Sequence, residues 1–248
     1  MQGTILVTGA GRGIGAETAK LAAARGYSVA VNFMANEAAA QRVVDAIRNS
    51  GGKAIAVQAD VSRESDVAQL FRTVDANLGT LAVLVNNAGV VDIQCRVENM
   101  REERLRRMMG INVIGSMLCA AQAVRRMSTS HGGAGGCIIN VSSAASRHGS
   151  PNEYVDYAAS KAAIDTFTVG LAKEVANEGI RVNAVRPGVI HTEIHASGGD
   201  PARAERMGPS LPMGRAGNAD EIAQAILWLA SGEASYCTGS ILDVAGGR

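Results

Sequence analysis

The chain lacks the features that usually divide a sequence into separate parts. It has no Pro- or Ser-rich linker, no block of like charges and no repeat at the spacing of a solenoid protein. Its five prolines are scattered over the second half of the chain, and 248 residues are enough to bury a substantial core. We therefore expect residues 1–248 to form a single domain.

The chain also has little net charge, because 24 Lys and Arg residues nearly balance 23 Asp and Glu residues to give +1. Such a balance produces no bulk electric field that would attract nucleic acid or anionic lipid. The N-terminus has no basic region or cleavage site, and we see no uncharged run long enough to span a bilayer. We predict a cytoplasmic protein with neither nucleic-acid nor membrane partners.

Cysteine pairs with metal-binding spacing are absent as well. Cys95, Cys119, Cys137 and Cys237 lie far apart without a Cys-x-x-Cys motif, which fits buried thiols in a reducing compartment. His191 and His195 lie four residues apart with Glu193 between them, but the zinc-protease motif needs Glu directly after the first His. We expect no metal site.

Short apolar runs alternate with helical patterns along the whole chain. This alternation predicts an α/β fold of the Rossmann type: a doubly wound, parallel, seven-stranded sheet with helices on both faces. Ser62 is a candidate N-cap for the third helix. The predicted strands are residues 4–8, 27–33, 54–60, 81–85, 137–141, 180–185 and 240–244, and the helices run to 25 and over 36–50, 62–78, 101–127, 155–178 and 220–231.

A glycine-rich turn joins the first strand to the first helix. The common G-x-G-x-x-G pattern would need a glycine at position 14, which is Ile14 in this chain. The turn fits a different pattern, Thr-Gly-x-x-x-Gly-x-Gly. Glycines let the backbone approach a pyrophosphate, which then binds the free N–H groups at the start of the helix. The predicted dinucleotide-binding residues of this turn are Gly9, Gly11, Arg12, Gly13, Ile14 and Gly15.

The end of the second strand bears on the choice between NAD and NADP. An acidic residue there would accept hydrogen bonds from a ribose 2′-hydroxyl and repel a 2′-phosphate. This chain has the neutral pair Asn32 and Phe33, and Arg12 lies within plausible reach. We expect the cofactor to be NADP, with NAD also possible.

Small and amide residues follow two further strands at their carboxyl ends, where an open α/β sheet binds its ligand. These residues are Asp60, Val61, Asn87, Ala88 and Gly89. The same residues also suit a loop held by side-chain to backbone hydrogen bonds, and both interpretations can hold together.

Tyr157 and Lys161 form a candidate acid–base pair. Residues four apart share one face of a helix, and a nearby ammonium favours the phenolate and lowers the pKa of a tyrosine. By itself the spacing is equally typical of a surface pair. Ser142 and Ser143 follow the fifth strand and reach the same edge of the sheet.

In this order and spacing, the motifs resemble those of the single-domain short-chain dehydrogenases/reductases over nearly the whole chain. Residues 149–157 are most similar to bacterial glucose 1-dehydrogenase-like and 3-oxoacyl-carrier-protein reductase-like members. The matching residues are Thr8, Gly9, Gly13, Gly15, Asp60, residues 86–89, Asn112, Ser142, Ser143, Tyr157, Lys161, Pro187, Gly188 and Thr192.

The resemblance implies a role for each matching residue. Tyr157 would be the general acid or base, and Lys161 would lower its pKa and hold the nicotinamide ribose. Ser143 would bind the substrate oxygen, with a one-residue insertion before Tyr157, and Asn112 would hold a water molecule. Pro187 and Gly188 lead to Val189, Ile190 and Thr192, which would position the nicotinamide carboxamide, whereas Asn87 and Asp60 would serve the adenosine.

These roles imply an NADP-preferring oxidoreductase that interconverts a ketone and a secondary alcohol on a small molecule, as a homotetramer. Residues 191–215 would form its substrate loop. One alternative is 3-oxoacyl reduction on an acidic carrier docked by Arg203, Arg206 and Arg215, which more often form a solvated face. Another is a non-catalytic dinucleotide sensor, which would not need the acid.

Overall fold

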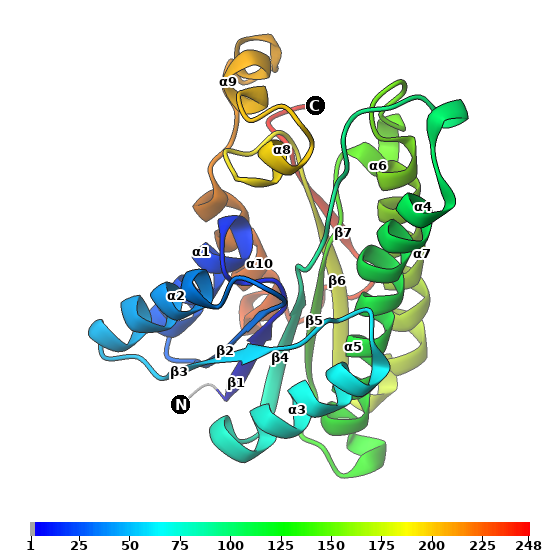
Figure 1. The fold of residues 1–248 in the computed structure, drawn as a ribbon. Coiled ribbons are helices and arrows are strands. Elements are labelled where there is room, and N and C mark those ends of the chain that lie inside the picture. Colours follow the sequence, from blue (N-terminus) through cyan, green and yellow to red (C-terminus); the bar gives the residue numbers. More distant parts are fainter. Residues whose placement is uncertain (1–2) are drawn as a thin grey trace.

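A computed structural model describes residues 3–248, and its centre is a parallel sheet of seven strands (Figure 1). The strand order is β3-β2-β1-β4-β5-β6-β7, so the doubly wound sheet is confirmed. The first and last residues of each predicted strand lie within two residues of those observed. The strands are β1 Thr4–Val7, β2 Ser28–Phe33, β3 Ala54–Gln58, β4 Leu81–Asn86, β5 Gly136–Val141, β6 Ile180–Pro187 and β7 Ile241–Val244.

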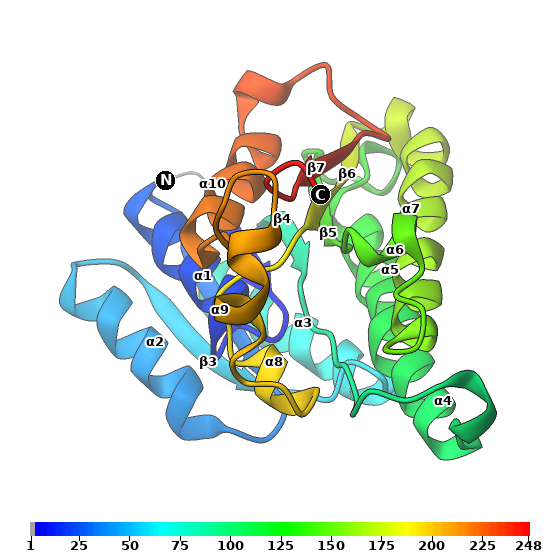
Figure 2. The ribbon, with the colours of Figure 1, turned by 90° about the horizontal axis from the view of Figure 1, so that it is seen from above.

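Helices cover both faces of the sheet, and each face has its own hydrophobic core (Figure 2). On one face pack α1 (Gly13–Ala24), α2 (Glu37–Asn49) and α10 (Ala219–Ala230). On the other pack α3 (Glu64–Leu78), α5 (Gly115–Met127) and α7 (Val155–Val175). The central strands are therefore buried on both sides, which explains their continuous apolar sequences.

The predicted helix over 101–127 exists, but its winding changes in the middle. Helix α4 (Glu102–Met109) passes through a π-helical turn, Gly110–Ile114, into α5 without a break. Single π turns occur often at functional sites, and this one contains Asn112. By length and composition this helix could cross a membrane, but the core residues Cys119, Ala123 and Met127 show that it packs inside the protein.

The predicted N-cap of α3 is wrong. The helix begins at Glu64 and its N-cap residue is Arg63, which makes no side-chain capping bond. The hydroxyl and the N–H of Ser62 both donate to Oδ1 of Asp60 instead, at 2.7 and 2.9 Å. A local turn around Asp60 has therefore outcompeted the cap for the serine hydroxyl.

The strand order reverses between β1 and β4, and a crevice opens at the carboxyl ends of these strands. The loosely patterned residues 191–215 lie over this edge and contain two short helices, α8 (Ile194–Ser197) and α9 (Arg203–Met207) (Figure 1). A third short helix, α6 (Ala145–His148), follows β5. The fold thus surrounds the crevice with loops from many parts of the chain.

Thr8 joins the two loops that flank the point of reversal. Its hydroxyl accepts hydrogen bonds from the N–H groups of Asn87 and Ala88, both at 3.0 Å, and donates to the carbonyl of Val85. The amide of Asn87 donates back to the carbonyls of Thr8 and Gly9. These bonds fix the glycine turn against the end of β4.

We predict that Thr8→Val lowers the free energy of unfolding by about 2 kcal/mol, because the half-buried N–H of Ala88 loses its acceptor and that of Asn87 keeps only the carbonyl of Val85, while the side-chain volume is kept. Urea denaturation would measure this. Thr73→Val is the control, since Thr73 is only partly buried on α3 and its side chain bonds only within its own helix. Equal stability of the two variants would contradict the proposed link between the loops.

Candidate active site

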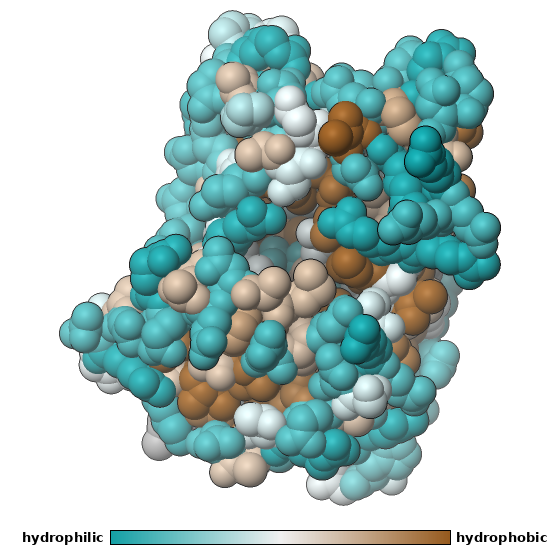
Figure 3. Space-filling view, viewed as in Figure 1, coloured by the Kyte–Doolittle hydropathy of each residue, from teal (hydrophilic) through white to brown (hydrophobic). Residues whose placement is uncertain are grey.

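Two connected cavities lie at the carboxyl edge of the sheet, where the surface is hollowed and hydrophobic residues gather in the hollow (Figure 3). One, of about 150 Å³, contains Tyr157, and we call it the tyrosine cavity. The other, of about 250 Å³, is lined by the glycine turn, and we call it the glycine-loop cavity. Both linings include Ile14, Asn87, Gly89, Thr192 and Ile194, so one elongated ligand can extend through both.

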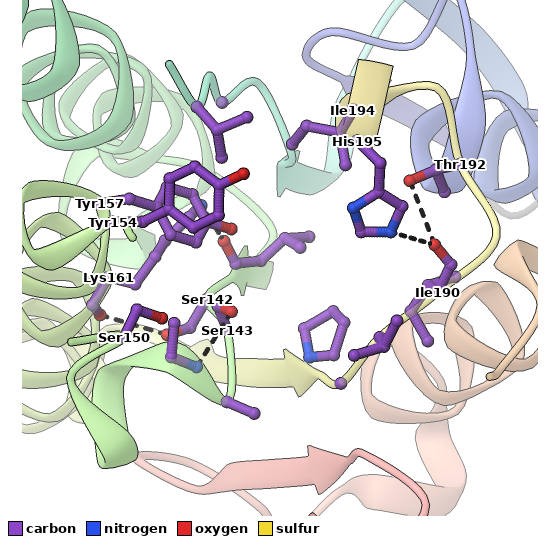
Figure 4. A pocket seen from close by; sticks show the side chains of 18 of the residues that line it. Ser142, Ser143, Ser150, Tyr154, Tyr157, Lys161, Ile190, Thr192, Ile194 and His195 are labelled. Atoms are coloured by element: carbon purple, nitrogen blue, oxygen red, sulfur yellow. Dashed lines mark hydrogen bonds between the residues drawn. The ribbon is translucent and has the colours of Figure 1, made fainter. Parts of the chain in front are cut away.

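Tyr157 lies in the first turn of α7 and faces the tyrosine cavity (Figure 4). Burial raises the pKa of its phenol, and a hydrogen bond with Ser143 opposes part of that rise. That Lys161 lowers this pKa stays a prediction. The ammonium lies over the ring, 5.6 Å from its centroid, and the loss of solvation of the phenolate dominates.

Lys161 lies on the same face of α7, as the four-residue spacing predicts, but it is buried rather than on the surface. Its ammonium donates to the carbonyl of Val141 at 2.7 Å. Burial lowers its pKa to about 8, against the opposing effect of Asp165 one turn further along the helix. Burying an ammonium costs solvation free energy. A lysine that is buried beside a cavity is therefore typical of a site that uses the ammonium.

The two serines after β5 have different surroundings. Ser142 is buried, and its hydroxyl donates to the carbonyl of Lys161 at 3.1 Å. Ser143 is partly buried, and its Oγ accepts the N–H of Ala145 at 3.1 Å. Its hydroxyl lowers the pKa of Tyr157, whereas the hydroxyl of Ser142 is bound to the backbone, so Ser143 is the serine that can act with the phenol.

The loop that carries the chain from Ser143 to Tyr157 is unusual in its backbone. Ser150 and Asn152 have φ angles of 44° and 64°, in the left-handed region that side-chain-bearing residues rarely adopt. Ser150 also lines the tyrosine cavity. Such conformations persist only where the surrounding structure enforces them, and they cluster at functional sites.

Asn112 lies behind the cavity and is completely buried. Its Oδ1 accepts the N–H of Val90 at 2.8 Å, and its Nδ2 donates to the carbonyl of Val90 and the hydroxyl of Ser160, both at 3.0 Å. The side chain thus braces the loop after β4 against α7. Its role in holding a water molecule stays a prediction.

The glycine turn fits a dinucleotide pyrophosphate. Gly9 and Gly13 have φ angles of 62° and 53°, and a Cβ on Gly15 would lie 2.5 Å from Nδ2 of Asn87. Helix α1, which starts here, has no side-chain cap and no acidic residue in its first turn. Its first N–H groups and its positive end are therefore available to an anion.

The end of β2 differs from the expected arrangement. Asn32 is buried: its Oδ1 accepts the N–H of Gly9 at 3.1 Å, and its Nδ2 faces the carbonyls of Val57 and Ala59. Although Asn32 lines the glycine-loop cavity, it serves mainly to hold the glycine turn. Phe33 belongs to the core, and the exposed Met34 lines the cavity in its place.

Arg12 and Asp60 both line the glycine-loop cavity. Arg12 is exposed, and its side-chain hydrogen bond is a weak one to the hydroxyl of Ser197 at 3.5 Å. The carboxylate of Asp60 accepts two hydrogen bonds from Ser62. The guanidinium is therefore the polar group of this cavity that is least committed to the protein itself.

Residues after β6 form the opposite wall of the tyrosine cavity (Figure 4). The carbonyl of Ile190 is bonded to Nε2 of His195 at 2.8 Å and accepts the hydroxyl of Thr192 at 3.5 Å. His191 lies instead near Glu205, 3.5 Å away. Within residues 3–248 no three His, Cys, Asp or Glu side chains are grouped so as to hold a metal ion.

Most of the predicted site residues converge on the two cavities. Four do not line either of them: Gly11 faces α2, Gly15 packs against Asn87, Phe33 is in the core and Asn112 lies behind the wall. Those that line a cavity are Gly9, Arg12, Gly13, Ile14, Asn32, Asp60, Val61, Asn87, Ala88, Gly89, Ser143, Tyr157, Lys161, Pro187, Gly188, Val189, Ile190 and Thr192.

Several lining residues were not among the sequence predictions. They include His148, Tyr154 and Arg248 in the tyrosine cavity and Met34 in the glycine-loop cavity, and Arg203, expected only as a docking residue, lines the tyrosine cavity too. Tyr154 donates its hydroxyl to the carbonyl of Gly198 at 3.2 Å and so closes the substrate loop over the cavity. No motif marks these residues, because they come from loops that only the folded chain brings together.

Comparison with known proteins gives matches over almost the whole chain. A family model described as enoyl-(acyl carrier protein) reductase matches residues 9–248. The "uncharacterized oxidoreductase YgfF" of Escherichia coli is 57% identical over 243 residues, covering 98% of each chain. Glucose 1-dehydrogenase 2 of Bacillus subtilis is 36% identical, covering 98% of this chain and 93% of the relative.

A solved structure supports the same relationship. A short-chain dehydrogenase from Burkholderia cenocepacia, determined in complex with NADP, superposes with a TM-score of 0.90 at 31% identity. The alignment covers 100% of this chain and 98% of that one. The fold of this chain is thus shared with that protein over almost the whole of both chains.

The lowered pKa of Lys161 predicts a pH-dependent stability. The unfolded lysine has its ordinary pKa of 10.5, so between pH 8 and 10.5 the unfolded state holds more protons than the folded state. The contribution of this group to the free energy of unfolding therefore rises with pH across that window. We expect Lys161→Met to remove this rise, as measured by urea denaturation at pH 7.5, 9 and 10.

Because buried thiols and phenols also titrate in this window, the informative quantity is the difference between wild type and variant at each pH. Lys173→Met is the matched control, since Lys173 lies exposed on the same helix. If Lys161→Met and Lys173→Met show the same pH dependence as the wild type, Lys161 is not held at a lowered pKa.

Proposed function

This chain belongs to the short-chain dehydrogenase/reductase family, and from that premise we propose that it is an NADP(H)-preferring enzyme that interconverts a ketone and a secondary alcohol. Members of this family are NAD(P)-dependent oxidoreductases. The observation that supports the proposal best is that Ser143, Tyr157 and Lys161 line one cavity, which shares part of its lining with the cavity of the glycine turn.

Tyr157 is the proposed general acid for carbonyl reduction and the base for alcohol oxidation. Its raised pKa keeps the phenol protonated at neutral pH, which suits the donor role in reduction. Ser143 would bind the same carbonyl oxygen, and two donors preorganised at that oxygen stabilise the negative charge that develops there. When bound, the cofactor supplies or accepts the hydride.

Lys161 has a separate proposed role on the cofactor side of the phenol. Its ammonium is buried between Tyr157 and Val141, and Gly89 lies close by, because a Cβ there would be 3.4 Å from Nζ. Lys161 would hold the nicotinamide ribose and stabilise the phenolate after the proton has left Tyr157.

The proposal also covers the localisation and the oligomeric state of the enzyme. We propose a cytoplasmic homotetramer, by analogy with the family. The exposed apolar side chains of Met109, Ile114 and Met117 on the helix over 102–127 support contact with other subunits.

The structure weakens the alternative of a carrier-bound substrate docked by three arginines. Arg203 is buried and paired with Glu153, and the other two also have acidic partners. Arg206 pairs with Asp200, and Arg215 with Glu221. A dinucleotide sensor remains a poorer explanation, since a sensor has no use for a phenol held beside a serine and a buried ammonium.

We predict that Tyr157→Phe lowers kcat with NADPH and a panel of small ketones by at least about 100-fold, because proton donation by a positioned acid contributes that much. NADPH affinity, followed by nicotinamide fluorescence, should be unchanged. Tyr236→Phe is the control, since this tyrosine is fully exposed. A variant that keeps its turnover would show that Tyr157 is not the acid.

We predict that NADPH binds more tightly than NADH and that Arg12→Ala reduces the affinity for NADPH by about tenfold, the effect of losing one charge-assisted hydrogen bond. The affinity for NADH should hardly change. Arg25→Ala at the other end of α1 is the control, because Arg25 bonds Gln224 outside the cavities. Equal loss for both cofactors, or a preference for NADH, would contradict the assignment of Arg12.

A further inference from the structure

The wall of the tyrosine cavity is one-sided in its charge. Besides Lys161, it includes two arginines, Arg203 and Arg248, and two histidines, His148 and His195. Among residues 3–248, no Asp or Glu side chain is part of this wall. An uncharged ketone would have no use for such an arrangement, and a negatively charged group would.

Arg203 is already neutralised. It lies in α9 and forms a two-pronged ion pair with Glu153, with N–O distances of 3.2 and 2.5 Å, while its guanidinium stacks 5.4 Å from the ring centroid of Tyr154. Its side chain is buried. This pair attaches the substrate loop to the segment before α7, so we assign Arg203 a structural role.

Arg248 has no such partner. Within the described residues its side chain makes no hydrogen bond and no ion pair, although it lines the same cavity. The turn before it contains Gly246 and Gly247, with φ angles of 61° and 87°, a conformation that brings the chain back from β7 to the cavity. Arg248 is exposed at the edge of the cavity; partial burial and the charge of Arg203 lower the pKa of Arg248, and the more distant carboxylate of Glu153 opposes part of that shift.

The two histidines, His148 and His195, add no positive charge to the wall of the cavity at pH 7. Burial is the main cause that lowers the pKa of both, and Arg248 lowers that of His148 further. Both are therefore neutral at pH 7. Nδ1 of His148 accepts the N–H of Ser150, which leaves Nε2 as a hydrogen-bond donor in the wall. Beyond Lys161, which serves Tyr157, the uncompensated charge is that of Arg248.

We propose that the substrate is a small oxo acid or hydroxy acid whose carboxylate is bound by Arg248, while its reacting oxygen lies against Ser143 and Tyr157. The inference deepens the proposed function and rests on it. One uncompensated guanidinium matches the single charge of a carboxylate and its planar pair of oxygens, whereas a phosphate monoester carries close to two charges. A cavity of about 150 Å³ accepts only a small molecule.

Binding can be tested without turnover. We would measure the affinity of pentanoate and of methyl pentanoate for the protein in the presence of NADP, by ligand-observed NMR. The acid should bind at least about tenfold more tightly than its ester, the size of effect expected for hydrogen bonds to a charged group. Arg248→Gln should abolish this preference, and Arg248→Lys should keep part of it.

Arg147→Gln is the matched control. Arg147 is exposed, pairs with Asp243 at 2.7 Å and does not line the tyrosine cavity, so its loss should leave the preference for the acid intact. Equal binding of acid and ester by the wild type would overturn the proposal. A preference that persists in Arg248→Gln would overturn it too, provided that NADPH affinity shows the variant to be folded.

Kinetics with 4-oxopentanoate and its methyl ester separate this inference from the proposed function. The expected result is a lower KM for the acid that rises about tenfold or more in Arg248→Gln, with a smaller change in kcat. Equal reduction of acid and ester would refute the carboxylate site and leave the oxidoreductase standing. Failure to bind NADPH would refute the oxidoreductase, while the NMR comparison would still decide whether Arg248 binds a carboxylate.

Discussion

The hydrogen bonds between Thr8 and the loop after β4 hold together the two segments between which the strand order reverses. Parallel strands all end at one edge, and the reversal opens a crevice there. If these loops separated, the glycine turn and the residues after β4 would no longer form one wall. Asn32 and Asn87 reinforce the same junction through bonds to Gly9. Polar side chains that look like ligand contacts in the sequence are thus partly structural.

The chemistry of the site follows from burying charge beside this junction. Lys161 is buried and Tyr157 is partly buried, so the phenol holds its proton more firmly and the ammonium holds its proton less firmly than in solution. The two pKa values, ordinarily close to each other, are thereby driven apart, so that near neutral pH the phenol keeps its proton while the lysine gives up its proton more readily than in water. Arg248 adds a positive charge that the protein itself does not neutralise, and this is the feature that a substrate is best placed to satisfy.

The differences between expectation and structure have a common physical cause: competition for polar groups. Ser62 is drawn into a turn by Asp60 and does not cap α3. The side chain of Asn32 hydrogen-bonds backbone groups. Phe33 packs into the core, and Met34 lines the cavity instead. A sequence pattern shows which groups can bond, but several partners are equally near along the chain, and only packing selects among them.

The sequence by itself determined the alternation of strands and helices, the glycine turn and the positions of Tyr157 and Lys161, because these depend on local periodicity and on contacts a few residues apart. The tertiary structure alone decided that the hydroxyl of Ser142 is bound to the backbone of α7 and that burial raises the pKa of the phenol. It alone brought His148, Arg203 and Arg248 into one cavity. These residues come from three separate segments, and their meeting depends on loop conformations and desolvation that no local pattern encodes.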